Sequence, residues 1–147
     1  MSQTNLAQPT HTDFDLTEQC RNTAAQLVDG FARQDIEMIM SLFAEDSTYC
    51  DVVGDGQRGD EYHGKKDIRT AFLQGFEMLG EHTYEALAVA ADGQTAFASW
   101  VLIIGRADDP SATRFDGADH FEMDENARVV LKKGWLKGQS EIPGSLS

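Results

Sequence analysis

The stretch Arg114–Asp124 reads RFDGADHFEMD, and its alternation of polar and apolar residues predicts a β-strand with one wet and one apolar face. Asp119 falls on the apolar side, together with Phe115 and Phe121. A carboxyl group among apolar side chains loses hydration, which raises its pKa unless a cation or several hydrogen-bond donors compensate. Asp119 is therefore either a functional acid or base near neutral pH, or a structural aspartate satisfied by neighbouring donors.

The composition indicates a single acidic domain. The 147 residues are a normal length for one domain, and the hydrophobic share of 41% is enough for one substantial core. The formal net charge of −13 opposes binding to phosphate backbones and to anionic lipid surfaces. Neither a nucleic acid nor a membrane is therefore expected as a partner.

The sequence also predicts where the protein resides. The two cysteines form no disulfide framework, and Met1–Asp13 has neither a basic region nor the apolar run of a signal peptide. No apolar run approaches the roughly 20 residues that a membrane span needs. We expect a soluble, cytoplasmic protein with a flexible leader at 1–14, one domain at 15–138 and a tail at 139–147.

Hydrophobic periodicity predicts helices in the first half of the chain and strands in the second. We expect helices at 15–31, 35–43 and 65–79, with a strand at 47–53 before the third helix. Further strands are expected at 81–91, 95–106, 114–124 and 128–137. This order of elements predicts an α+β fold.

The strand expected at 95–106 is apolar on both faces. Ala96, Trp100 and Leu102 fall on one side, and Phe97 and Ile103 fall on the other. A sheet with helices on one side leaves its second face open, so this pattern predicts that a second subunit covers it in a homodimer. The alternative is a central strand buried under long loops of the same chain.

Three local motifs occur in an order and spacing that resemble one superfamily. They are Ser41–Asp51 (SLFAEDSTYCD), the helix start in His63–Phe72 (HGKKDIRTAF) and Gly117–Val130 (GADHFEMDENARVV). The chain resembles the nuclear transport factor 2-like superfamily over residues 16–137, and most closely its ketosteroid isomerase-like and SnoaL-like, polyketide cyclase-like members. The resemblance implies a cone-shaped fold in which three helices pack on a curved, mostly antiparallel sheet that encloses a pocket.

The resemblance also implies roles for two carboxylates. In ketosteroid isomerase-like members, the acid that ends the first strand moves a proton between carbons, and its position matches Asp51. The acid of the Asp-His-Phe strand stays protonated and hydrogen-bonds the enolate oxygen, and its position matches Asp119. In polyketide cyclase-like members, the same later aspartate is instead the general base of an aldol-type ring closure.

The chain departs from these relatives at other positions. The tyrosine of helix one that donates to the oxyanion corresponds here to Leu27, so a second donor is missing and a steroid isomerase is disfavoured. Tyr49, Tyr62 or Tyr84 could supply a hydroxyl from another wall, or could be ordinary rim or core tyrosines. His82 lies where dehydratase-like relatives such as scytalone dehydratase place a catalytic histidine, although a simply packed or exposed histidine is the alternative.

Metal and dinucleotide sites are not expected. The four histidines lack paired ligand spacing, and the cysteines form no C-x-x-C motif. Gly54–Gly59 fits G-x-G-x-x-G, but the next helix begins several residues too late to face a pyrophosphate, and neighbouring acids would repel one.

These observations predict a cofactor-independent acid–base enzyme of isomerase or cyclase type that acts on a small, neutral, hydrophobic carbonyl compound. The predicted catalytic residues are Asp119, Asp51 and His82. The predicted ligand-binding residues are Tyr49, Leu27, Phe31, Phe72, Trp100 and Phe121. The alternatives are a non-catalytic small-ligand-binding or interaction module, and a dehydratase-like enzyme with a His–Asp pair.

Overall fold

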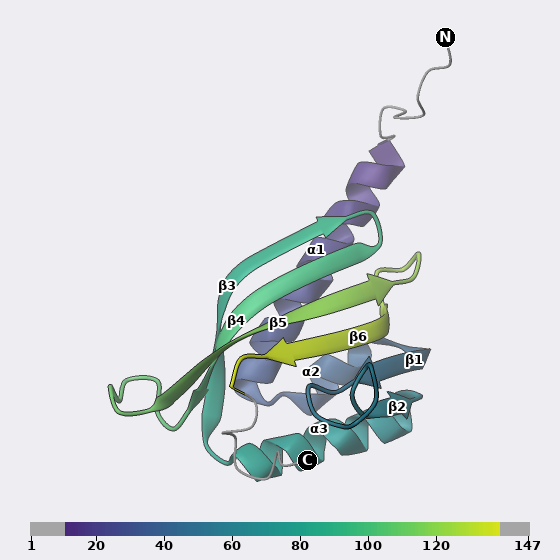
Figure 1. Ribbon diagram of the computed structural model, residues 1–147. Coiled ribbons are helices and arrows are strands. Elements are labelled where there is room, and N and C mark those ends of the chain that lie inside the picture. Colours follow the sequence, from purple (N-terminus) through teal and green to yellow (C-terminus); the bar gives the residue numbers. More distant parts are fainter. Residues whose placement is uncertain (1–10, 139–147) are drawn as a thin grey trace.

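The computed structural model describes residues 11–138 as three helices and a six-stranded sheet (Figure 1). The elements follow the chain as α1 (His11–Arg33), α2 (Ile36–Ser41), β1 (Phe43–Cys50), β2 (Glu61–His63), α3 (Lys65–Leu79), β3 (His82–Asp92), β4 (Thr95–Ile104), β5 (Thr113–Met123) and β6 (Val129–Leu136). None of these helices is long and apolar enough to cross a membrane.

The sheet is mixed and open, with the strand order β2-β1-β6-β5-β4-β3. Its only parallel pair within residues 11–138 joins β1 to β6, and all other neighbours are antiparallel. This pairing brings the last strand into the middle of the sheet, next to the first. The predicted α+β architecture with a mostly antiparallel sheet is therefore confirmed.

The alternation predicted for the Asp119 strand is also confirmed. In β5, Phe115, Asp119, Phe121 and Met123 are buried, whereas Asp116 on the opposite face is exposed. Each inward residue of β5 pairs with an inward residue of β4 or β6 on the neighbouring strands. The register of these strands therefore determines which side chains surround Asp119.

The helices cover one face of this sheet. Helix α1 packs against β3 and β4, and α3 packs against β1 and β2 (Figure 1). Helical spacing places Cys20, Ala24, Leu27 and Val28 on the buried side of α1, where they join the core. Since α1 and α3 cover different strands, the space between them is bounded by the middle of the sheet.

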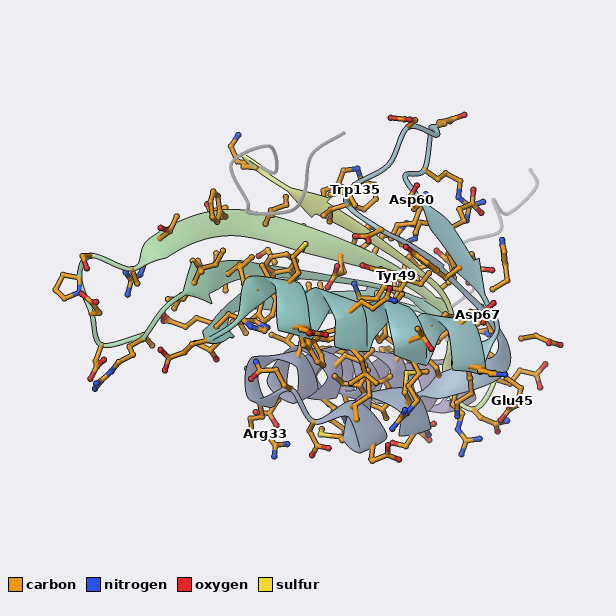
Figure 2. The ribbon with its side chains drawn as sticks, turned by 90° about the horizontal axis from the view of Figure 1, so that it is seen from below. Arg33, Glu45, Tyr49, Asp60, Asp67 and Trp135 are labelled. Atoms are coloured by element: carbon orange, nitrogen blue, oxygen red, sulfur yellow. The ribbon has the colours of Figure 1, made fainter. Side chains whose placement is uncertain are left out.

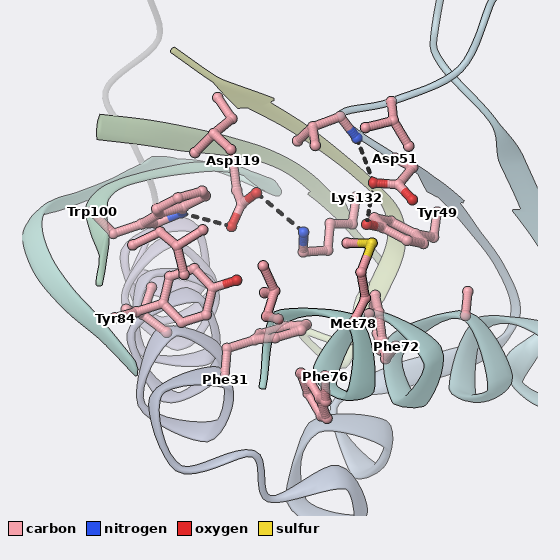
Figure 3. A pocket seen from close by; sticks show the side chains of 18 residues that line it. Phe31, Tyr49, Asp51, Phe72, Phe76, Met78, Tyr84, Trp100, Asp119 and Lys132 are labelled. Carbon is pink, nitrogen blue, oxygen red and sulfur yellow. Dashed lines mark hydrogen bonds and ion pairs between the residues drawn. The ribbon is translucent and has the colours of Figure 1, made fainter. Parts of the chain in front are cut away.

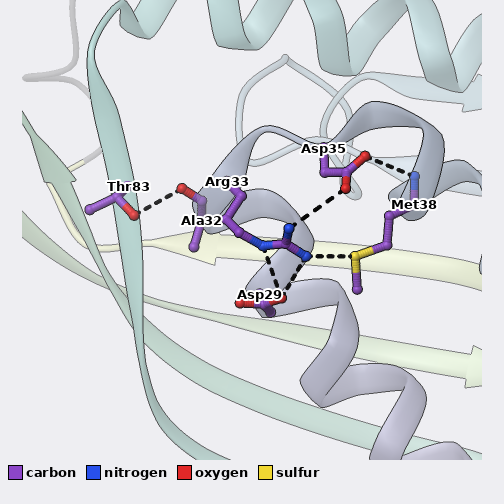
Figure 4. Close-up of polar contacts among 6 residues, drawn as sticks. All are labelled: Asp29, Ala32, Arg33, Asp35, Met38 and Thr83. Carbon is purple, nitrogen blue, oxygen red and sulfur yellow. Dashed lines mark hydrogen bonds and ion pairs between the residues drawn. The ribbon is translucent and has the colours of Figure 1, made fainter.

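Polar contacts hold the junction between α1 and α2 (Figure 4). Arg33 ends α1 and donates to Asp29 at 2.8 Å, while Asp35 caps α2 by accepting a backbone N–H, as predicted for the start of that helix. Thr83 of β3 donates to the carbonyl oxygen of Ala32 at 2.9 Å. These contacts fix the end of α1, from which the neighbouring Phe31 reaches the cavity described below.

Some boundaries differ from the predicted ones. The second helix ends at Ser41 instead of 43, because Phe43 already begins β1 and is buried in the core. The strand β2 was not predicted, since its three residues are too few to show a period. The predicted leader and tail lie outside the described residues, except that 11–14 belong to α1.

Strand β4 carries apolar side chains on both faces, as predicted, but the two faces differ in how exposed these side chains are. Trp100 and its inward neighbours are buried on the helix side. On the outer side Ile103 is fully buried within the chain, whereas Phe97 is 53% exposed. Trp135 of β6 is 54% exposed and lies on the face of the sheet away from the helices (Figure 2). Phe97 and Trp135 are thus exposed aromatic side chains of β4 and β6, whereas Trp100 is buried on the helix side.

Candidate functional site

A cavity of about 140 Å³ lies between α1, α3 and the inner face of the sheet (Figure 3). Most of its wall is apolar, including Phe31 from α1 and Phe72 and Phe76 from α3. The polar groups that line it are Tyr49, Asp51, Tyr84, Trp100, Asp119 and Lys132. An apolar cavity with a few converging polar groups is the usual form of a small-molecule site.

Asp119 is held by two donors. It is only 5% exposed; Trp100 Nε1–H donates to its Oδ2 at 3.0 Å, and Lys132 Nζ donates to its Oδ1 at 3.1 Å. The sheet register brings these groups together, since Asp119 pairs with Ala98 and Gly134, each two residues from one of the donors. The cation and the donor that could compensate a buried carboxylate are therefore both present, and each oxygen keeps a second lone pair.

Two glycines make room for this arrangement. A Cβ atom on Gly117, which pairs with Trp100, would lie 2.3 Å from the indole ring. A Cβ atom on Gly134, which pairs with Asp119, would lie 3.2 Å from the carboxylate Oδ1. The missing side chains let the indole and the carboxylate lie across the neighbouring strands.

Lys132 was missed by the sequence analysis. It is 7% exposed and its ammonium lies over the rings of Tyr49, Phe31 and Phe72, at 4.9, 5.2 and 5.9 Å from their centres. The available signal was the pair Lys132-Lys133 in a predicted strand, because alternation turns one of two adjacent residues inward. A buried lysine beside a carboxylate gives the cavity its only cation among the described lining residues.

Asp51 lies directly after β1 at the cavity wall. Tyr49 Oη–H donates to its Oδ1 at 3.0 Å, and the backbone N–H of Val52 donates to the same oxygen at 2.7 Å. Within residues 11–138, Oδ2 has no hydrogen-bond partner. The cavity wall therefore contains two carboxylates, Asp119 on β5 and Asp51 just after β1.

Tyr84 presents a hydroxyl group to the cavity (Figure 3). Its ring packs edge-on against Trp100, with centres 5.0 Å apart, and its hydroxyl has no hydrogen-bond partner in the described part of the chain. Burial, followed by the charges of Asp119 and Asp51, raises the pKa of Tyr84. The phenol thus remains a neutral donor over the ordinary pH range.

We expect the tyrosines of the folded protein to ionise late. Burial and nearby carboxylates raise the pKa of all three tyrosines of the chain, and that of Tyr49 is raised well above its usual value. Between the ordinary value of about 10 and the folded values, the unfolded chain binds fewer protons, so stability falls as pH rises. Ultraviolet titration of phenolate absorbance should show delayed ionisation that ends with alkaline unfolding. Three ordinary titrations in a still folded protein would contradict this.

The structure brings together most of the predicted site residues. The cavity wall contains Asp119, Asp51, Tyr49, Phe31, Phe72 and Trp100. No group of three or more histidine, cysteine, aspartate or glutamate side chains is placed to hold a metal ion in residues 11–138.

Three predicted site residues do not line the cavity. Leu27 and Phe121 are fully buried in the core, where neighbouring side chains separate them from the cavity. His82 is 5% exposed and its ring nitrogens face other groups: Nδ1–H donates to Gly80 O at 2.7 Å, and Nε2 lies 3.4 Å from Gln34 Nε2. Its position is that of a packed histidine.

The comparisons with known proteins identify the family. The family model of the SnoaL-like domain matches residues 24–131. The chain belongs to this family. The resemblance noted from the sequence motifs is therefore confirmed. A search of curated proteins finds no match.

Solved structures share the fold. An NTF2-like protein of unknown function from Mesorhizobium loti is 18% identical, with 83% of this chain and 93% of that chain covered at a TM-score of 0.67. A putative ketosteroid isomerase from Kribbella flavida is 24% identical, with 86% and 84% covered at 0.65. The epoxide hydrolase/cyclase-like enzyme SalBIII of pyran ring formation in salinomycin is 18% identical, with 82% and 92% covered at 0.63. The neighbours thus include isomerase-type and cyclase-type proteins.

Proposed function

We propose that this SnoaL-like protein is a cofactor-independent acid–base enzyme of isomerase or cyclase type. Its substrate would be a small hydrophobic carbonyl compound bound in the cavity. The observation that carries the proposal is the Asp119 carboxylate, which faces a largely apolar cavity and is positioned by one hydrogen bond to each oxygen. Such a group is oriented without being saturated, so it can still accept a proton.

The proposed chemistry begins with proton transfer from carbon. Asp119 would take the proton from the carbon next to the carbonyl. The electron pair of that C–H bond would form the C=C bond of the enolate, and the π pair of the C=O bond would become the charge on oxygen. The unpartnered hydroxyl of Tyr84 can donate to that oxygen. Return of the same proton from Asp119 to another carbon of a conjugated enolate, directly or by way of Asp51, the second carboxylate of the wall, gives isomerisation. Attack of the enolate carbon on a second carbonyl gives ring closure, and the proton then passes from Asp119 to the new alkoxide oxygen.

The size of the cavity limits the substrate. An engineered protein cavity of about 150 Å³ binds benzene. The cavity here, at about 140 Å³, therefore suits a single-ring or short-chain compound. This favours a ligand of cyclohexanone size over a steroid.

The two alternatives fit the geometry less well. A His–Asp dehydratase would need His82 at the cavity and paired with a carboxylate, whereas its ring nitrogens face Gly80 and Gln34. A non-catalytic binding module would use the same cavity, but it would have no need for a buried carboxylate that an apolar side chain could replace at lower desolvation cost.

Deuterium exchange tests the proposal. The protein is incubated in D₂O with cyclohexanone and with open-chain ketones, and loss of the proton signal next to the carbonyl is followed by NMR. We expect exchange well above the buffer rate. Ketones that bind, as seen by thermal shift, without any exchange would instead support a passive binding module.

We also propose that the protein is a homodimer formed through the outer face of the sheet. Trp135 exposes a large aromatic surface there, on the helix-free side (Figure 2). Phe97 is also largely exposed, and strand alternation turns it away from its buried neighbours Ala96 and Ala98. Phe97→Glu should convert a dimer into a monomer because it places a charge in an apolar interface. Light scattering measures the outcome, with Leu73→Glu on exposed α3 as the control. A monomeric wild-type protein at micromolar concentration would refute the dimer.

A further inference from the structure

The ammonium group of Lys132 has more donors than partners. It carries three N–H groups, yet its only hydrogen bond within residues 11–138 goes to Asp119. Its other neighbours are the ring faces of Tyr49, Phe31 and Phe72. With a side chain only 8% exposed, Lys132 has little water to satisfy the remaining donors. A buried cation with unused donors that lines an apolar cavity points to an oxygen atom on the ligand.

We propose that Lys132 forms an anion-binding subsite of this cavity, which takes the oxygen of an enolate or phenolate. The ligand class is then carbonyl compounds with an acidic C–H group and small phenols, which enter neutral and are held as anions. The catalytic part of this inference rests on the proposed function, whereas phenolate binding does not require turnover.

The charges balance in such a step. Before the reaction, the Asp119 carboxylate and the Lys132 ammonium neutralise each other at 3.1 Å. When Asp119 takes the carbon-bound proton, it becomes neutral, and the negative charge moves to the carbonyl oxygen. Lys132 stays protonated and changes its partner from the carboxylate to the enolate oxygen. No net charge enters or leaves the cavity, so the step avoids the cost of an unpaired buried charge.

The other groups around Lys132 are compatible with this exchange. Tyr49 on β1 pairs directly with Lys132 across the sheet, and its hydroxyl is committed to Asp51. Tyr84 remains available as a neutral second donor to the same oxygen. In ketosteroid isomerase-like relatives a tyrosine of helix one donates to this oxygen, and this chain has Leu27 at the corresponding position. Lys132 would replace that missing donor.

Binding of 4-nitrophenol tests the subsite, since its phenolate is read directly from visible absorbance. In Asp119→Asn, Lys132 loses its carboxylate partner and should favour the phenolate, lowering the pKa of the bound probe by about one unit or more, a tenfold preference. The double variant Asp119→Asn/Lys132→Met should lose this preference completely. The double variant removes both members of the ion pair and so leaves neither charge unpaired. Lys132→Met alone would instead leave the buried Asp119 carboxylate without its cation.

Lys133→Met is the matched control. Lys133 is the next residue, carries the same charge and lies over Trp135 on the outer face, so its loss should leave the bound probe unchanged. Equal phenolate preference in Asp119→Asn and in the double variant, or no preference in either, would overturn the subsite, provided that circular dichroism shows both to be folded. Ketone exchange by the wild-type protein in that case would leave the acid–base proposal standing, and only the role of Lys132 would fall.

Discussion

Replacing Asp119 with asparagine is expected to reduce deuterium exchange into a bound ketone by about 10²–10⁴-fold, the usual contribution of a positioned general base. Asparagine has nearly the same shape, but its amide cannot take a proton at neutral pH. The amide also has only one acceptor oxygen, whereas Trp100 and Lys132 each donate to a different carboxylate oxygen. One donor therefore loses its partner, and the buried Lys132 ammonium loses its counter-charge, so we expect a stability loss of about 3–5 kcal/mol. NMR exchange rates and thermal unfolding measure the two effects.

Asp116→Asn is the control for this experiment. Asp116 lies on the same strand but on the exposed outer face, so its replacement should change neither exchange nor stability appreciably. Exchange that persists in Asp119→Asn but disappears in Asp51→Asn would make Asp51 the base and reduce Asp119 to a supporting group. Persistence in both variants would remove the carboxylates from the mechanism.

The sequence was sufficient to place Asp119 because the pattern that determines its position is local. Alternation over 114–124 separates an inner from an outer face, and the observed burial of β5 follows it. The third helix was likewise predicted with its observed bounds, since its apolar spacing and flanking glycines are local features as well. Patterns within single elements were therefore sufficient to predict most of the helices and strands.

The cation could not be placed in the same way. Its position depends on the parallel pairing of β6 with β1, which brings Lys132 opposite Tyr49 although the two strands are far apart in the chain. Strand alternation indicates that either Lys132 or Lys133 turns inward, but only the register across three strands shows which one reaches Asp119.

Burial and access to the cavity are also different properties. Leu27 and Phe121 were correctly placed on inward faces, yet both are covered completely. Whether an inward side chain lines a cavity depends on how far the facing helix stands from the sheet. This spacing is set by the aromatic side chains of α3, such as Phe72, and cannot be read from the period of a single strand.

Gly117→Ala is expected to damage both the fold and the site. The new Cβ atom would lie 2.3 Å from the Trp100 ring and 2.8 Å from the backbone oxygen of Trp135, and the second contact cannot be relieved by a side-chain rotation. We expect a loss of roughly 1–3 kcal/mol from overpacking, and ketone exchange should fall because the displaced indole no longer donates to Asp119. Chemical denaturation and exchange rates measure both.

Gly75→Ala separates this steric effect from the general effect of replacing a glycine. A Cβ atom on Gly75, in helix α3, would meet nothing within 4 Å, so this variant should be more stable by about 0.5–1 kcal/mol. Because Gly75 lines the cavity, this variant is a control for stability and not for ketone exchange. If Gly117→Ala were as stable and as active as the wild type, the Trp100 indole would not need its observed position. The hydrogen bond from Trp100 would then be dispensable, and Lys132 alone would have to hold the Asp119 carboxylate in the cavity.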